Sequence, residues 1–277
     1  MPVVCPSCGG DDVDLVEATD DGRRRVRCLE CGEVWVRGEA KRVYRTTTTF
    51  DDLRRRFPGP EDVPEHARRA AEDLKAQFLR RHPVVDPAVV SFWHRYQEVF
   101  SPDGLYAADP QEFKDFANSN IGANPGNMSV FNTAWNEMGP AEGARRVRDA
   151  IEYLLYADST PYLEDRLTQL VEGDRDFGMI GFREALLTKV LCIVQPDRFL
   201  PIVKYTGVAG KKEIAERLYQ LYLPDPERVS WTIGRLIIWS NDLLRELVGD
   251  GFADMQHAAS YLWWAKDQGL SNRSSGR

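Results

Sequence analysis

Four cysteine residues near the N-terminus have the spacing of a tetrahedral metal site. Cys5 and Cys8 form one Cys-x-x-Cys pair, Cys28 and Cys31 form a second, and 19 residues separate the two pairs. Two thiolates three positions apart on a tight turn can take two vertices of a tetrahedron. Paired motifs at this separation predict one structural zinc ion, which stabilises the fold and takes no part in catalysis. Iron held by the same four sulfurs is the alternative metal.

The residues around these cysteines have the pattern of a zinc ribbon. Gly9 and Gly32 follow the second cysteine of each pair, where glycine permits the positive φ of a closing turn. Asp21-Gly22 is a strong hairpin signal. Three strands are expected, over residues 13–18, 23–27 and 34–36. Because so few residues cannot bury a sufficient core, the metal is expected to supply the missing stability.

Basic side chains after the hairpin turn form a candidate nucleic-acid surface. Arg23, Arg25 and Arg27 alternate along one expected strand, so they share a face that can contact phosphates. The alternative is a cross-strand ladder in which these arginines pair with Asp14 and Glu17. The sequence leaves both interpretations open. The candidate DNA-contacting residues are Arg23, Arg24, Arg25, Arg27, Arg37, Lys41 and Arg42.

The composition limits how such a surface is used. The 277 residues carry a formal net charge of -7, so nucleic-acid contact is expected only from a local basic patch. There is no apolar run of transmembrane length and no signal-peptide pattern, which predicts a cytoplasmic protein that is not bound to a membrane. The fifth cysteine, Cys192, lies in an apolar run and is expected to be a buried thiol.

Beyond the ribbon the chain is expected to fold as α-helices. Apolar side chains recur every three to five residues, and period-two alternation is lacking after residue 50. The predicted fold is therefore mainly α, with a β zinc ribbon ahead of an all-helical domain. Helix starts are expected near residues 65, 87, 110, 140, 161, 181, 208, 229 and 252, and a loop over 119–127. The predicted domains are a zinc ribbon (1–45), a linker with one helix (46–82), a helical domain (83–270) and a disordered tail (271–277).

No set of catalytic residues is evident. Pro102-Asp103 and Glu112-x-Lys114 spell a nuclease-like pattern, but those carboxylates act from adjacent strands and this segment is expected to be helical. Gly207–Lys212 resembles the end of a P-loop but lacks its first glycine and its Ser or Thr. We therefore predict that this chain is not an enzyme. The tryptophans are predicted mainly as core, and a subset are candidates to line a pocket for an extruded base.

Part of the chain resembles the N-terminal, non-motor region of McrB-like AAA+ restriction proteins. Gly181–Lys204 contains a Thr-Lys-x-Leu helix that leads into Pro-x-x-Phe-x-Pro. The matching positions are Thr188, Lys189, Leu191, Pro196, Phe199 and Pro201. Glu164–Leu167 and Tyr261–Trp264 resemble flanking helices of that region, so the resemblance spans residues 90–268.

This resemblance implies a module that recognises modified or foreign DNA. The chain has no Walker motif, so an AAA+ motor or a nuclease subunit is expected as a partner or a further region. The resulting hypothesis is a DNA-recognition or adaptor module of a prokaryotic restriction and antiviral defence system. The alternative is a protein-interaction scaffold whose zinc ribbon docks a partner protein. Secondary contacts are predicted at Lys189, Lys204, Lys211 and Lys212.

Overall fold

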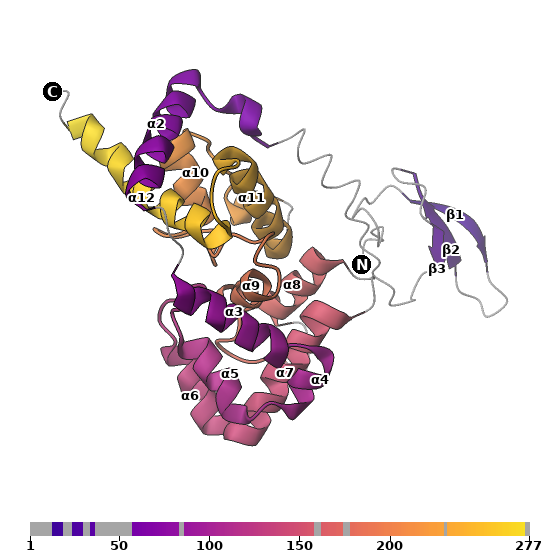
Figure 1. Cartoon of the computed structure of the whole chain (residues 1–277). Helices are drawn as coiled ribbons and strands as arrows, with labels where there is room; N and C mark the ends of the chain where they lie inside the picture. Colours follow the sequence, from indigo (N-terminus) through magenta and orange to yellow (C-terminus); the bar gives the residue numbers. More distant parts are fainter. Residues whose placement is uncertain are drawn as a thin grey trace.

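The structure is a computed structural model. It describes residues 13–18, 24–29, 34–36, 57–82, 86–157, 162–173, 178–229 and 232–274. Within these ranges the chain forms eleven α-helices and one small β-sheet (Figure 1). The prediction of a mainly helical fold is confirmed. None of the described helices is both long enough and apolar enough to span a membrane.

The sheet has three antiparallel strands in the order β1-β2-β3. The strands are β1 (Val13–Ala18), β2 (Arg24–Cys28) and β3 (Val34–Val36), which confirms the expected strand positions to within one residue. Pairing places Asp14 opposite Arg27 and Glu17 opposite Arg25, with a register shift between Leu15 and Glu17. The register therefore places these two acidic residues at the cross-strand positions opposite the two arginines.

One half of the helical body contains five consecutive helices (Figure 1). They are α3 (Pro87–Val99), α4 (Pro102–Ala107), α5 (Pro110–Asn118), α6 (Ser129–Met138) and α7 (Pro140–Tyr156). Each of α3, α4 and α5 begins with proline, and the preceding residue caps the helix. The side chains of Asp86, Ser101 and Asp109 accept a hydrogen bond from a main-chain N–H of the first turn. The Asp-Pro and Ser-Pro pairs therefore set these boundaries.

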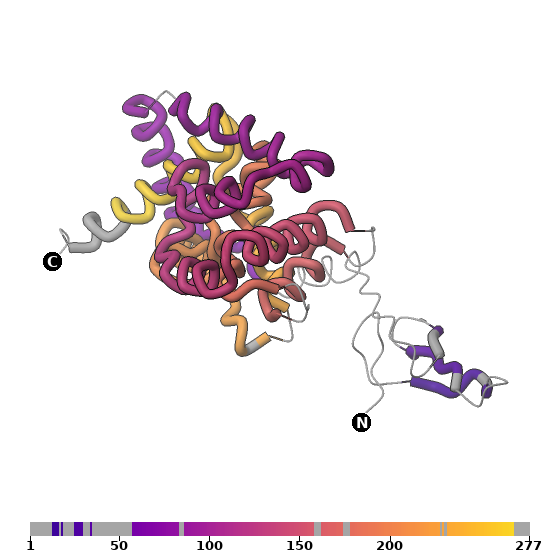
Figure 2. Tube along the Cα trace, turned by 90° about the horizontal axis from the view of Figure 1, so that it is seen from below, coloured from indigo at the N-terminus to yellow at the C-terminus, as the bar shows by residue number. Residues whose placement is uncertain are grey.

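The other half contains the helices from the two ends of the described body. They are α2 (Glu65–Arg81), α10 (Lys211–Tyr219), α11 (Ile233–Val248) and α12 (Met255–Ser274). Helix α2 packs on α10 and α12 although it is far from them in sequence. Helix α12 projects from the body at its C-terminal end (Figures 1 and 2). Two short 3-10 helices, η1 (Pro60–Asp62) and η2 (Pro226–Arg228), precede α2 and α11.

Helix α8 (Leu163–Glu172) joins these halves, because it packs on both α7 and α11. Helix α9 (Glu184–Val194) packs on α3, α7 and α8. Every residue of α9 from Leu186 to Ile193 is buried, as its nearly continuous apolar sequence requires. Cys192 is 2 % exposed, and this confirms the expected buried thiol. Helices α8 and α11 approach closely at Gly234, whose N–H donates to the Thr168 hydroxyl at 3.0 Å.

Residues 57–82 belong to the body, not to a linker. Ala67, Ala71 and Phe78 of α2 lie in the hydrophobic core. The Tyr261 hydroxyl of α12 donates to the main-chain oxygen of Ala71 at 2.7 Å. The predicted boundary at residue 83 was thus wrong, because the apolar face of α2 is buried by helices from the far end of the chain. The predicted disordered tail, 271–277, was wrong for residues 271–274, whose backbone continues α12, and residues 275–277 lie outside the described residues.

Candidate functional site

The β2 strand presents two of the predicted DNA-contacting arginines to solvent. Arg25 and Arg27 are exposed, whereas Val26 and Cys28 are buried, at 6 % and 0 % exposure, on the opposite face. Arg27 makes no ion pair with any acidic residue in the described part of the chain, including Asp14 opposite it. Period-two alternation therefore separates a cationic face from the face that carries a predicted metal ligand.

Most of the predicted ribbon site lies outside the described residues. This holds for the side chains of Cys5, Cys8, Cys31, Arg23, Arg24, Arg37, Lys41 and Arg42. Of the predicted zinc ligands, only Cys28 can be examined. Its complete burial on the face away from the arginines fits a thiolate that is closed off from water, as a structural zinc site requires.

Two of the four predicted secondary contacts are buried lysines and face the core. Lys189 is 0 % exposed, and its Nζ donates to the main-chain oxygens of Phe116 and Ser119. Lys211 is also 0 % exposed, and its Nζ has no hydrogen-bond partner. Burial lowers the pKa of Lys189 to about 7 and that of Lys211 to about 8. Neither ammonium group is accessible to a phosphate, so these two predictions are corrected.

The other two lysines lie at the surface. Lys212 is half-buried and its Nζ pairs with Asp225 at 2.8 Å, so this charge already has a partner. Lys204 is exposed and lines a pocket described below. Lys204 is therefore the one secondary contact that keeps an accessible ammonium group without an ion pair among the described residues.

The Asn- and Gly-rich segment 119–127, here called the seam loop, lies between the end of α5 and the start of α6. Its polar side chains bond its own backbone: Asn124 accepts from Gly126 N at 2.9 Å and Asn127 from Ser129 N at 2.8 Å. Gly122 has φ +76°, and a Cβ there would meet the Ile193 side chain at 2.5 Å. The loop composition therefore reflects tight local turns and close packing on α9.

One pocket lies beside the early residues of the seam loop, between α2, α3 and α12. We call it the aromatic pocket, and its volume is about 630 Å³. Its lining includes the rings of Phe78 and Trp264, whose centroids are 5.6 Å apart, and the amides of Asn120 and Gln256. The Gln256 Oε1 atom is buried and has no hydrogen-bond donor. An unsatisfied buried acceptor is costly, so this atom is suited to receive an N–H from a ligand.

A histidine helps to shape this pocket but is not free to react. The His257 Nδ1 atom accepts from Ala253 N at 3.2 Å, and its Nε2 lies 2.6 Å from the main-chain oxygen of His82. Because Nδ1 accepts, Nε2 must carry the proton and donate it to His82. Both ring nitrogens are thus occupied, and His257 joins the end of α2 to the start of α12.

A second pocket lies beside the later residues of the seam loop, and we call it the lysine pocket. Its volume is about 500 Å³, and its lining includes Asn124, Lys204, Trp263 and Lys266. Lys266 is 7 % exposed and its Nζ donates to the main-chain oxygen of Val208 at 2.8 Å. The Trp263 Nε1 atom is buried without a hydrogen-bond acceptor. The consecutive residues Trp263 and Trp264 of α12 thus contribute to two pockets that share the seam loop.

The nuclease-like pattern does not form a metal site. Glu112 receives three hydrogen bonds of 2.8–3.1 Å from the Arg95 guanidinium. Lys114 lies on the same helix, α5, and bonds Asn136 at 3.3 Å. Within the described residues, no group of three or more His, Cys, Asp or Glu side chains is placed to hold a metal ion. Glu112 is best explained as a partner of Arg95 that ties α5 to α3.

Sequence reasoning identified the seam loop and the tryptophans separately but not the pockets they form. The pockets bring together residues from 78–82, 86–89, 120–126, 203–210 and 256–267. Comparisons with protein-family models, with curated proteins and with solved structures gave no match. The assignment of function therefore depends on the residues and their geometry.

Proposed function

We propose that this chain is a nucleic-acid recognition module in which the aromatic pocket receives an unstacked base. The observation that carries the proposal is the pairing of the Phe78 and Trp264 rings with the unsatisfied Gln256 acceptor. Every nucleobase has a flat π-face, and adenine, guanine and cytosine carry an exocyclic amine that can donate to such an acceptor. A nucleobase therefore supplies both a flat ring for the aromatic side chains and an N–H for the Gln256 acceptor.

The size and lining of the pocket agree with this ligand class. Pockets for small ligands have volumes of roughly 300–1,000 Å³, and the aromatic pocket lies within that range. Asn and Gln side chains form paired hydrogen bonds with adenine in particular. Asn120 and Gln256 lie on opposite elements of the pocket, the seam loop and α12. This arrangement supports recognition of a base edge between two amide groups.

Two further features support contact with the nucleic-acid backbone. Lys204 offers an exposed ammonium group in the lysine pocket, which shares the seam loop with the aromatic pocket. Arg25 and Arg27 offer two guanidinium groups on one strand face. In this proposal a structural zinc ion, held by Cys5, Cys8, Cys28 and Cys31, maintains the ribbon. A local set of cations is what an acidic protein needs for phosphate contact.

The proposal places the chain in a restriction-type defence system, where an AAA+ motor or a nuclease partner supplies any cleavage. The resemblance at Thr188–Pro201 supports that role. A gel-shift or filter-binding assay over a salt series tests it. We expect binding to DNA at low salt that weakens as salt rises. Joint replacement of Arg25 and Arg27 by serine should weaken DNA binding and reduce its dependence on salt. Arg69→Ser, at an exposed position of α2, is the control and should leave DNA binding unchanged. No binding at low salt would overturn the proposal.

A second function is favoured by the strand register. Asp14 and Glu17 lie directly opposite Arg27 and Arg25, which is the register of a cross-strand ladder, although Arg27 and Asp14 form no ion pair. In that case the chain is a scaffold that docks proteins, in keeping with its net charge of -7. The same double arginine variant separates the two functions. Lost DNA binding with intact partner capture favours recognition of DNA, and lost capture with unchanged DNA binding favours the scaffold.

A further inference from the structure

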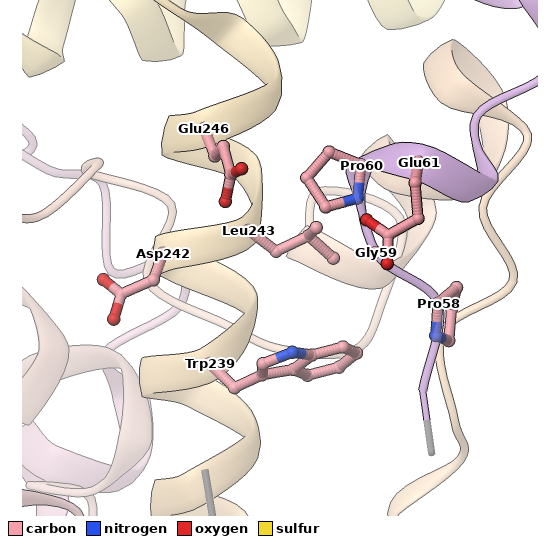
Figure 3. Close-up of a pocket in the computed structure, with 8 residues that line it drawn as sticks. All are labelled: Pro58, Gly59, Pro60, Glu61, Trp239, Asp242, Leu243 and Glu246. Atoms are coloured by element: carbon pink, nitrogen blue, oxygen red, sulfur yellow. The ribbon is translucent and has the colours of Figure 1, made fainter. Parts of the chain in front are cut away.

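A third pocket lies away from the seam loop, where η1 packs against α11 (Figure 3). We call it the acidic pocket, and its volume is about 260 Å³. Residues 58–61 form one wall, and α11 forms the other with Trp239, Asp242, Leu243 and Glu246. These four residues share one side of the helix because their spacing is three and four.

The charge of this pocket is uniformly negative. Glu61, Asp242 and Glu246 line it, and no Lys, Arg or His is part of the lining. None of the three carboxylates makes an ion pair with a described residue, and Asp242 accepts one hydrogen bond, from the Asn241 amide at 3.2 Å. Figure 3 shows the Glu61 and Glu246 carboxylates on the two walls of the pocket, whereas the Asp242 carboxylate points away from residues 58–61. The buried Lys211 ammonium interacts electrostatically with Asp242 and lies outside the lining.

An aromatic ring lies at the bottom of this pocket. Trp239 is 4 % exposed, and Figure 3 shows its indole below Leu243 and opposite residues 58–61. Phe57 supports the ring from the side, with centroids 5.6 Å apart. The indole N–H has no hydrogen-bond acceptor in the described part of the chain. The Trp239 side chain is nearly buried but lines the pocket, so its N–H is a donor that a ligand in the pocket can use beside the carboxylates.

We propose that the acidic pocket binds an arginine side chain presented by a partner protein. A guanidinium group stacks on an indole face and donates to carboxylates on more than one side, which a compact ammonium does less well. The main-chain carbonyl beside that arginine supplies the acceptor that the Trp239 N–H lacks. A free polyamine has no such carbonyl. A metal ion is disfavoured because no metal-binding group of three forms among the described residues.

This inference is independent of the proposed function. A pocket with three carboxylates repels phosphate, so the same site cannot serve DNA. It fits an adaptor that holds a partner on α11 and η1 and a nucleic acid at the seam loop. Its failure would leave the aromatic pocket unaffected, and failure of base recognition would leave the acidic pocket unaffected.

Nuclear magnetic resonance provides the test, because one side chain binds weakly on its own. The probe is a blocked pentapeptide, acetyl-Gly-Gly-Arg-Gly-Gly-amide, titrated into the full chain. The Trp239 indole resonance is assigned by its loss in Trp239→Phe. We expect this resonance to shift in a saturable way, with roughly tenfold weaker binding in the joint variant Glu61→Gln and Glu246→Gln. Glu98→Gln, an exposed carboxylate on α3, is the matched control and should bind as wild type does.

Peptide analogues complete the experiment. The same peptide with citrulline, which keeps the shape of arginine without its charge, should not bind, and the lysine peptide should bind more weakly than the arginine peptide. Three results would each overturn the inference: no shift of Trp239 with the arginine peptide, equal shifts with citrulline, or unchanged binding in the joint variant. Spermidine that binds as tightly as the peptide would assign the pocket to free polyamines and would also overturn it.

Discussion

The Lys189 Nζ atom lies 2.9 Å from the main-chain oxygen of Phe116 and joins the centre of α9 to the last turn of α5. The same ammonium group also donates to Ser119, the first residue of the seam loop. The rings of Phe92 and Phe116 lie 5.2 Å and 4.8 Å from it. Lys189 was predicted to contact DNA. It instead holds the seam loop, which lines both the aromatic and the lysine pocket.

Replacement of Lys189 by methionine should therefore loosen the seam loop. The variant keeps the length of the side chain but leaves the carbonyl groups of Phe116 and Ser119 without a donor. We expect the free energy of unfolding to fall by about 1–3 kcal/mol, which urea denaturation measures. Lys204→Met, at an exposed position, should change stability by less than about 0.5 kcal/mol. Equal stability of the two variants would show that the Lys189 contacts do not hold the loop.

Replacement of Lys211, by contrast, should stabilise the protein. Its ammonium group is buried without a hydrogen bond, although Cys192, Glu184 and Asp242 favour its charge in part. Lys211→Met should therefore raise the free energy of unfolding at pH 7, by a gain on the order of 1–3 kcal/mol. Thermal unfolding followed by circular dichroism checks the direction. A lower midpoint temperature than that of wild type would contradict the prediction.

The lowered pKa values of Lys189 and Lys211 also predict how stability depends on pH. The unfolded chain binds more protons at these two lysines than the folded chain does, between pH of about 7 and the ordinary value of 10.5. Stability should therefore rise as pH increases from 7 to about 9, and Lys211→Met should reduce the slope. Above that range the raised pKa values of Cys192 and of buried tyrosines such as Tyr96 act in the opposite direction. Burial raises the pKa of Asp165 to about 6, but the effect of this group lies below that window. A free energy of unfolding that stays constant over this pH range in wild type would refute the expectation.

The contact between α8 and α11 predicts a sensitive glycine. A Cβ atom at Gly234 would overlap the main-chain oxygen of Glu164 and crowd the Thr168 hydroxyl. Gly234→Ala should destabilise the protein by about 1–3 kcal/mol even though alanine favours helices. Arg245→Ala, on an exposed position of the same helix, is the control and should stay within about 0.5 kcal/mol of wild type. A stabilised Gly234→Ala variant would mean that the two helices can move apart at little cost.

Sequence periodicity predicted most of the helices, because their starts carry local signals such as Asp109-Pro110. Two helices, α4 and α6, were not predicted. Helix α4 has only six residues, and α6 has no proline at its start, although Phe131, Ala134 and Trp135 have helical spacing. The sheet followed from alternation and the Asp-Gly turn. These features depend on residues that are close together in the sequence, so they can be predicted from the sequence alone.

Features that depend on distant contacts could not be predicted in this way. Nothing in residues 65–81 indicates that Phe78 meets Trp264, nearly the whole helical body away in sequence. The burial of Lys189 and Lys211 likewise depends on which helices cover them, because an isolated lysine is normally exposed. Both the aromatic pocket and the correction of the predicted lysine contacts come from tertiary packing.

The central proposal is tested most directly by comparing two DNA duplexes that differ in one mismatched base pair. A mismatched base leaves the stack at lower cost, so a protein that holds an extruded base should bind that duplex more tightly. We predict that wild type prefers the mismatched duplex by roughly tenfold. Trp264→Leu should remove the preference, whereas Tyr222→Ala, at a ring that is 72 % exposed and outside the pockets, should keep it. Equal affinity of wild type for both duplexes, or an unchanged preference in Trp264→Leu, would contradict base recognition by the aromatic pocket.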